Sequence, residues 1–307
     1  MHIQEFITSN VMQLLRAMQN VQSEINPLQV FLEVNQVDYL NLRSQGLTIE
    51  DLQNLCRALK ENKTVIALDL GSNRIGLEGA LCLQKLLEAN TALISLNLER
   101  NPLCVNGAAL LAQGLKTNTR LRTLNLRRTQ MCSAGAEHVA AALYINATLK
   151  SLDLGLNGLS KRTGFYLAAA LKLNLSLITL NLEDNQLGCE GIKPLAEVCM
   201  HNEMLTILHL GGNQIKDEGA HALLQVVNFI VQQPLRPFVV HVTQNGISQE
   251  QLVLLEKALA QHKANIESIK PIVERYLPTT LSSIVTDYLG LETQASNNPR
   301  GVKRLRA

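Results

Sequence analysis

A short alternation of apolar and polar positions returns along most of the chain. In "LNLERNPL", which begins at Leu96, two leucines flank one polar residue, and Asn101 follows three positions after the second leucine. The alternation predicts a short strand whose leucines face inward. A side-chain amide both donates and accepts hydrogen bonds, so Asn101 can satisfy backbone groups in the turn that must follow the strand. The pattern therefore indicates a structural asparagine rather than a catalytic one.

The same pattern recurs with a nearly constant period. The position of Asn101 is occupied in turn by Gln45, Asn73, Asn101, Thr129, Asn157, Asn185, Asn213 and Asn245. These positions are 28 residues apart six times and 32 apart at the last step. Apolar residues at helical spacing lie between the strands, so each copy predicts one strand and one helix. A period of this length is typical of a solenoid built from stacked repeats.

Two further columns follow the same period. A glycine recurs six residues after the asparagine position and is expected to let each helix pack closely on its strand; it is found at Gly79, Gly107, Gly135, Gly191 and Gly219. A second asparagine column is expected to end each helix in the left-handed conformation; it comprises Asn62, Asn90, Asn118, Asn146, Asn174 and Asn202. Three of these match a glycosylation sequon, but their place in the column predicts a structural role.

These residues resemble the ribonuclease-inhibitor-like class of leucine-rich repeats. The resemblance implies an α/β fold, a right-handed β/α horseshoe with a parallel inner sheet, outer helices and helical caps. Similar proteins include leucine-rich effectors of intracellular bacterial pathogens, the sensor arm of cytosolic innate-immune receptors and Ran GTPase-activating protein. We expect an N-terminal helical cap at 1–36, eight repeats of about 28 residues at 37–263, a C-terminal helical cap at 264–290 and a disordered basic tail at 291–307.

Composition narrows the class further. Aromatic residues are 3% of the 307 and tryptophan is absent, so the 46% hydrophobic content must form a core of leucine and alanine. The formal charge of +2 argues against nucleic acid as a partner. None of the six cysteines forms a C-x-x-C pair, which disfavours a zinc finger and indicates reduced thiols. Without a signal-peptide pattern or a long apolar run, we expect a cytoplasmic protein with no membrane span.

The inward side of the sheet is the first candidate site. Basic residues cluster in repeats three to five, and an acidic pair follows in repeat six, which suits a protein partner of complementary charge. The candidate residues are Arg100, Arg122, Asn125, Arg127, Arg128, Lys150, Asp153, Glu183, Asp184 and His209. An ordinary solvated face with ion pairs between repeats is the alternative. His209 and His241 share one column, but no cysteine accompanies them, so no metal is expected.

The stretch "LPTTLSSIVTDYL" is the second candidate site. It resembles the first helix of an F-box, which binds the adaptor subunit of cullin ubiquitin ligases. The residues that carry this resemblance are Leu277, Pro278, Leu281, Ile284, Tyr288 and Leu289. Only 18 residues follow Leu289, so the other F-box helices lack sequence. A helix that caps the last repeat is the alternative.

Motifs for hydrolase, nucleotide-binding, zinc-protease and kinase chemistry are missing, so we expect no enzymatic activity, no cofactor and no metal. The expected function is that of a non-enzymatic scaffold that binds a protein partner on the concave face. We expect a monomer rather than an oligomer. By analogy we expect an adaptor, or a bacterial effector that is secreted into host cytosol. The alternatives are a substrate receptor of a cullin ubiquitin ligase through residues 277–289, and a regulator of a small GTPase.

Overall fold

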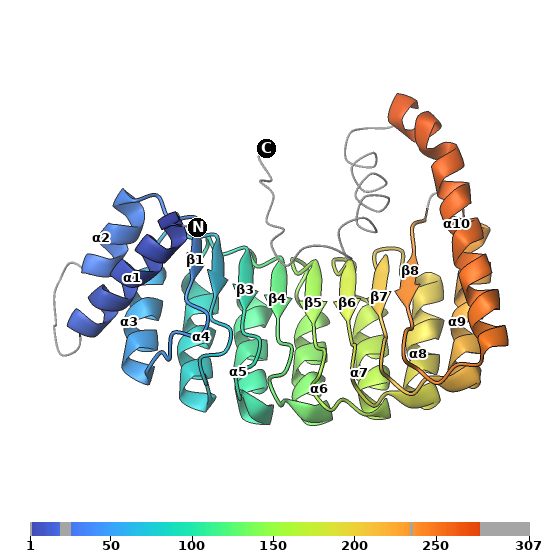
Figure 1. The fold of residues 1–307 in the computed structure, drawn as a ribbon, viewed down its shortest axis with the longest axis horizontal. Coiled ribbons are helices and arrows are strands. Elements are labelled where there is room, and N and C mark those ends of the chain that lie inside the picture. The colour runs from blue at the N-terminus through green and yellow to red at the C-terminus, as the bar shows by residue number, and fades with distance from the viewer. Residues whose placement is uncertain (1, 19–25, 234–235, 277–307) are drawn as a thin grey trace.

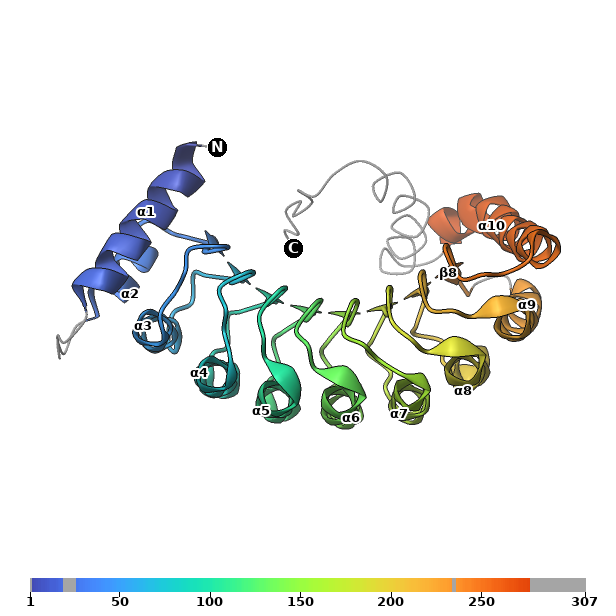
Figure 2. The ribbon, with the colours of Figure 1, turned by 60° about the horizontal axis from the view of Figure 1, so that its bottom comes forward.

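The computed structural model describes residues 2–18, 26–233 and 236–276 as a curved stack with one sheet inside and helices outside (Figures 1 and 2). Eight parallel strands pair in chain order. They are β1 Tyr39–Asn41, β2 Ala67–Asp69, β3 Ser95–Asn97, β4 Thr123–Asn125, β5 Ser151–Asp153, β6 Thr179–Asn181, β7 Ile207–His209 and β8 Val239–His241. The predicted α/β leucine-rich-repeat solenoid is confirmed, and repeats are numbered below by their strands.

The helices form the outer layer of the same stack (Figure 2). Two helices precede the first strand, and one helix follows each strand. Their bounds are α1 His2–Ala17, α2 Pro27–Val34, α3 Ile49–Leu59, α4 Leu77–Ala89, α5 Cys104–Thr117, α6 Cys132–Leu143, α7 Lys161–Leu171, α8 Gly188–His201, α9 Lys216–Val231 and α10 Gln249–Tyr276.

The 28-residue period fixes the register of the sheet. Leu68 lies opposite Leu96, and Leu96 lies opposite Leu124, so equivalent leucines stack from repeat to repeat. All three are nearly inaccessible to solvent. Because every strand contributes the same residue to the same depth, one continuous leucine core runs along the stack, and no single repeat could bury its apolar side alone.

The turn asparagines link each repeat to its neighbours. The Oδ1 atom of Asn101 accepts from the backbone N–H groups of Asn73 and Ile75, at 3.0 and 2.9 Å. Its Nδ2 atom donates to the carbonyls of Leu70 and Leu98, both at 3.0 Å. Asn101 is fully buried, so these bonds satisfy backbone groups that would otherwise be unpaired away from water. Asn101 thus holds the turns of repeats two and three together.

The second asparagine column works differently from the expectation. Asn90 ends α4 with φ −74° and ψ 131°, and Asn118 ends α5 in the same extended conformation, so the left-handed prediction was wrong. Instead, Asn90 Oδ1 accepts from the N–H groups of Ala92 and Leu93, while its Nδ2 donates to the Leu59 carbonyl of the preceding helix. The side chain, rather than an unusual backbone angle, reverses the chain. These buried amides are not available for glycosylation.

Repeat eight replaces that asparagine with an arginine. By the column's rule, the next asparagine would donate to the carbonyls of Cys199 and Asn202, as Asn202 itself donates to those of Leu171 and Asn174. Arg236 Nη2 donates to these same two carbonyls, and Nη1 donates to that of Met200 at 2.8 Å. The guanidinium therefore continues the ladder where the longer repeat departs from the period.

The two ends of the sheet differ. At the first strand, α1 lies against β1, and its Thr8 hydroxyl donates to the Asn41 carbonyl at 2.8 Å. At the last strand, α10 packs on α9 and runs unbroken from repeat eight to Tyr276. The expected start of a separate C-terminal cap at 264 therefore falls inside a helix, because Pro271 does not interrupt it. The F-box-like residues 277–289 and the basic tail lie outside the described residues.

The contacts of the recurring glycines also differ from the expected packing of each helix on its strand. A Cβ atom built on Gly107 would lie 3.0 Å from the Leu103 side chain and 3.4 Å from the Ala80 side chain of the preceding helix. At this position the glycine thus lets neighbouring helices approach, instead of bringing a helix onto its strand.

The turn ladder predicts opposite effects for two substitutions. Asn101→Ala leaves several buried backbone groups unpaired and should lower the free energy of unfolding by about 3 kcal/mol. In repeat four, Thr129 has no amide oxygen to offer the N–H of Asn101, so Thr129→Asn should raise the free energy of unfolding by about 1 kcal/mol. Denaturant unfolding of both variants checks this. A stabilising Asn101→Ala or a strongly destabilising Thr129→Asn would contradict the assigned role.

Candidate functional site

A row of left-handed residues lines the edge of the sheet where the strands end. The residue three positions after the end of each strand has a positive φ, between 54 and 67°, and only repeat seven uses glycine at this position. The row, here called the turn row, comprises Ser44, Ser72, Arg100, Arg128, Leu156, Asp184, Gly212 and Gln244. For side chains other than glycine this conformation costs roughly 1–2 kcal/mol each. Its central members Arg100, Arg128, Leu156 and Asp184 combine that cost with side chains that reach solvent.

Arg127 crosses an entire repeat to reach its partners. Its Nη2 atom lies 2.6 Å from Asp184 Oδ2, and its Nη1 atom lies 3.4 Å from Glu183 Oε2, two strands away. Gly155 stands between them, and a Cβ atom there would collide with the Arg127 guanidinium. Three of the predicted site residues are therefore paired with one another. For them the alternative of ion pairs between repeats holds.

The same arrangement occurs earlier in the stack. Arg43 Nη2 lies 2.8 Å from Glu99 Oε2, and Gly71 lies between them in the turn after β2. Glu99 also pairs with Arg100, whose Nε atom is 3.4 Å from Oε1. The order arginine, glycine, glutamate thus repeats every three repeats in one column. That periodic signal is present in the sequence but was not used in predicting the site.

Arg122 and Lys150 lie at the opposite edge of the sheet. Both precede their strands, whereas Arg127 and Arg128 follow theirs. Five residues of extended chain separate Arg122 from Arg127, or about 16 Å. Arg122 Nη1 donates to the Thr148 carbonyl at 2.9 Å. The predicted basic cluster is therefore two separate groups, one at each edge.

Asn125 and Asp153 accept hydrogen bonds from nearby backbone groups at the ends of their strands. Asn125 Oδ1 accepts from the N–H of Arg127 at 2.9 Å, and Asp153 Oδ1 accepts from that of Gly155 at 2.8 Å. Asp153 Oδ2 also accepts from Asn181 Nδ2 at 3.1 Å. Burial raises the pKa of the Asp153 carboxyl, against the lowering effect of the Gly155 hydrogen bond and of Arg127. These side chains lie on the sheet between its two edges.

His209 and His241 stack on adjacent strands. Their ring centroids are 4.6 Å apart with planes 12° from parallel. Burial, and then the neighbouring His241, lower the pKa of His209, although Glu183 lies 3.8 Å away and opposes the shift. In the described part of the chain no three histidine, cysteine or acidic side chains gather closely enough to hold a metal ion.

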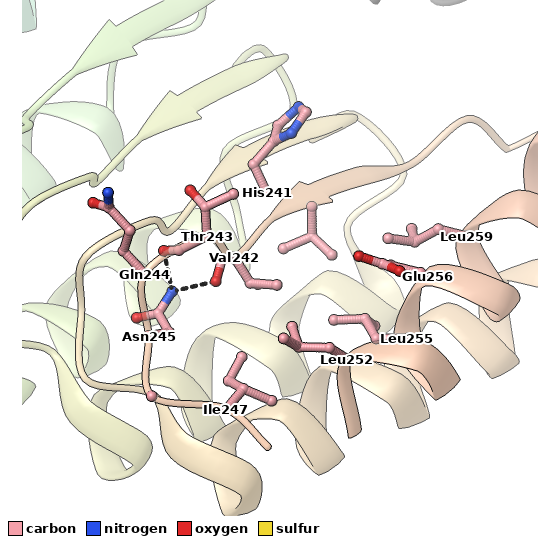
Figure 3. A pocket seen from close by; sticks show the side chains of 12 residues that line it. His241, Val242, Thr243, Gln244, Asn245, Ile247, Leu252, Leu255, Glu256 and Leu259 are labelled. Atoms are coloured by element: carbon pink, nitrogen blue, oxygen red, sulfur yellow. Dashed lines mark hydrogen bonds between the residues drawn. The ribbon is translucent and has the colours of Figure 1, made fainter. Parts of the chain in front are cut away.

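A cavity of about 530 Å³ opens at the last strand, between β8 and α10 (Figure 3). Val242, Leu252, Leu255 and Leu259 give it an apolar wall, and Asn245 closes one side through its bonds to the Val242 and Thr243 carbonyls. The cavity thus lies at the last strand of the stack, apart from the turns that contain Arg127 and Arg128.

The six cysteines differ in their burial. All six are free; Cys56 and Cys199 are buried, and burial raises the pKa of both thiols. Cys104 and Cys132 are exposed at the first positions of α5 and α6. No nucleophile with a neighbouring base emerges from these positions.

With this geometry established, comparison with known proteins supports the class of fold. A family model for the leucine-rich repeat matches residues 61–83, 146–164, 173–196 and 201–224. Together with the sheet and helix order, this defines a leucine-rich-repeat solenoid. A search of the curated proteins gives no match.

Two solved structures share features of the fold. Leiomodin-1 actin-binding site 2 has 16% identity and a TM-score of 0.41, covering 47% of this chain and 80% of that one. The tropomodulin C-terminal domain of Caenorhabditis elegans has 13% identity and a TM-score of 0.44, covering 53% and 95%. Separately, none of the described helices is long and apolar enough to cross a membrane.

Gly155→Ala should uncouple the long ion pair. The new methyl group pushes the Arg127 guanidinium off its path, so a double-mutant cycle between Arg127→Ala and Asp184→Asn should lose its coupling of about 0.5–1 kcal/mol. Overall stability should change little, because the displaced atoms end a flexible side chain. The equivalent cycle across Arg43 and Glu99 is the control and should be unaffected. A coupling that stays intact in the Gly155→Ala background would show that the glycine is not required.

Asp153→Asn should stabilise the protein at neutral pH. Because folding raises the carboxyl pKa, the aspartate favours the folded state most below its unfolded pKa and loses that advantage as pH rises. The variant should therefore unfold less readily than the parent at pH 7, with the gain vanishing near about pH 4. Denaturation at both pH values measures this, with Asn125→Asp as the reciprocal control. A gain that grows on acidification would contradict the shift.

Proposed function

We propose that this chain is a non-enzymatic scaffold that binds a protein partner along the turn row on its concave side. The carrying observation is that Arg100, Arg128, Leu156 and Asp184 occupy a costly backbone conformation with side chains accessible to solvent. Glycine would remove that cost, and repeat seven uses it. Strain retained at exposed positions is common at binding sites.

The row offers three kinds of contact within three turns. Arg128 is an exposed cation and Leu156 is 37% exposed. Asp184 is held by Arg127, so its carboxylate is fixed rather than freely rotating. An apolar residue between charges of opposite sign can fix the orientation of a partner, and a rigid surface loses little entropy on binding.

The ion pairs behind the row support this proposal. Arg127 pairs with two carboxylates, and Arg43 also pairs with two, so these ion pairs brace the turns across several repeats. This leaves Arg128, rather than Arg127, as the cation that offers its charge to a partner. The effector, cullin-receptor and GTPase alternatives rest on resemblance alone and are not part of the proposal.

Affinity purification from eukaryotic cell lysate tests the proposal. Arg128→Glu and Leu156→Gly should each reduce recovery of a specific partner about tenfold, the effect of losing roughly 1.4 kcal/mol. Leu156→Gly should leave stability within about 1 kcal/mol of the parent, because relief of strain offsets the flexibility of glycine. Arg162→Glu, an exposed site on α7, is the matched control. A partner retained by both turn variants would refute the proposed surface.

A further inference from the structure

A second surface lies where the helices end and the strands begin. Equivalent positions in the first repeats hold Glu61, Ala89 and Thr117, but later repeats place large side chains there: Ile145, Leu173, His201 and Phe229. Ile145 and Leu173 are each 57% exposed. The Asn174 amide donates to the Asn146 carbonyl at 2.9 Å, which holds the residues that precede each asparagine side by side.

Tyr144 and Leu175 add two more exposed apolar side chains to this second surface. Tyr144 follows α6 and is 57% exposed, and Leu175 is 72% exposed. His201 continues the row toward Phe229, whose ring it meets edge-on with centroids 6.3 Å apart. The large apolar side chains are therefore contiguous across neighbouring repeats, whereas scattered single ones would need no explanation.

The charged side chains around this second surface are all positive. We define the helix-end rim as the segments 116–123, 144–151 and 172–179, which contain no aspartate or glutamate. Their cations are Lys116, Arg120, Arg122, Lys150 and Lys172. The corresponding segments before β2, β3 and β7 each carry one glutamate, at Glu61, Glu88 and Glu203, and the segment before β1 carries Glu33 and Asp38. The loss of acidic residues therefore coincides with the gain of apolar ones.

Arg122 and Lys150 are held close together within this rim. Both are half-buried, and Arg122 reaches the Thr148 carbonyl, in the loop that also contains Ile145. Burial, and then the charge of Arg122, lower the pKa of Lys150. Among the described residues, neither has a carboxylate within ion-pair distance. Two like charges in this position are stabilised by an anion from outside.

We propose that the helix-end rim binds an acidic protein segment whose apolar side chains cover Ile145, Leu173 and Leu175 while its carboxylates meet Arg122 and Lys150. Charge complementarity selects the partner, because five cations without a carboxylate in the rim attract an acidic chain. An amphipathic helix lays apolar anchors on such a surface at regular spacing.

A protein segment fits this rim better than an anionic membrane. The exposed leucines stand outermost, while Arg122 and Lys150 are half-buried behind them on the side toward the sheet. A flat bilayer that touched Leu175 would reach those two cations poorly, whereas a peptide side chain can extend to them. The rim is also on the edge opposite the turn row, so this inference is independent of the proposed concave site.

Binding of synthetic peptides to the full chain tests the inference. The probe is a fluorescent amphipathic helix of about 18 residues, with leucines on one face and glutamates on the other. Companion peptides replace glutamate by glutamine or lysine. Fluorescence anisotropy should show binding of the glutamate peptide that weakens with salt, with affinity at least tenfold lower for the lysine peptide. Vesicles of phosphatidylcholine with and without phosphatidylserine form a separate arm.

Matched variants locate the site. Leu173→Asp with Leu175→Asp, and Lys150→Glu alone, should each lower affinity for the glutamate peptide at least tenfold. Ala89→Asp with Thr91→Asp occupies the same positions three repeats earlier and should have no effect, nor should Arg128→Glu on the turn row. Absence of peptide binding, equal loss in the control variants, or binding to phosphatidylserine vesicles without peptide binding would each overturn the inference.

Discussion

Buried asparagine amides hold the repeats of this protein in place. A turn leaves backbone N–H and carbonyl groups inside the stack, where water cannot reach them. Each asparagine pairs such groups from two repeats at once, as Asn157 does for the N–H of Thr129 and the carbonyls of Leu126 and Leu154. Because the side chain spans the gap between repeats, it sets both their spacing and their register. The leucine core can then be continuous.

Because the asparagine ladder needs certain positions in every repeat for structural contacts, only the other positions can serve in binding. The inward leucines and the two asparagine columns are occupied by structural contacts. The turn row and the helix-end rim lie just outside them, one at each edge of the sheet. Their side chains differ between repeats while the backbone beneath stays constant, so the fold can present varied chemistry without a change in architecture.

The sequence predicts the fold well because its signal is periodic. The positions of Leu96 and Asn101 recur often enough to define strand, turn and stacking without tertiary information. The failures come from residues that act across repeats. Arg127 reaches Glu183 across 56 residues of sequence, and the sequence alone left open whether these charges serve a partner or form ion pairs between neighbouring repeats. Arg122 and Arg127 were also expected to lie together because they belong to the same repeat. They lie at opposite edges of the sheet.

Departures from the period were the other source of error. Arg236 takes the carbonyls that an asparagine would bind, but its place six residues beyond the expected position hides the equivalence. The helix through Pro271 was divided because the repeat pattern ends before it. In both places three-dimensional packing decides the outcome, and local propensity does not reveal it.

Hydrogen exchange of the whole chain tests the central claim, that turn asparagines bind the repeats into one unit. The N–H groups of Asn73, Ile75, Asn157 and Leu159 lie in turns, yet each donates to an asparagine of the next repeat. They should exchange as slowly as the N–H groups of Leu70 and Leu154, which directly follow β2 and β5 and donate to carbonyls of the next strand. Exchange at the rate of exposed loops would contradict it, because the repeats would then be held by leucine packing alone.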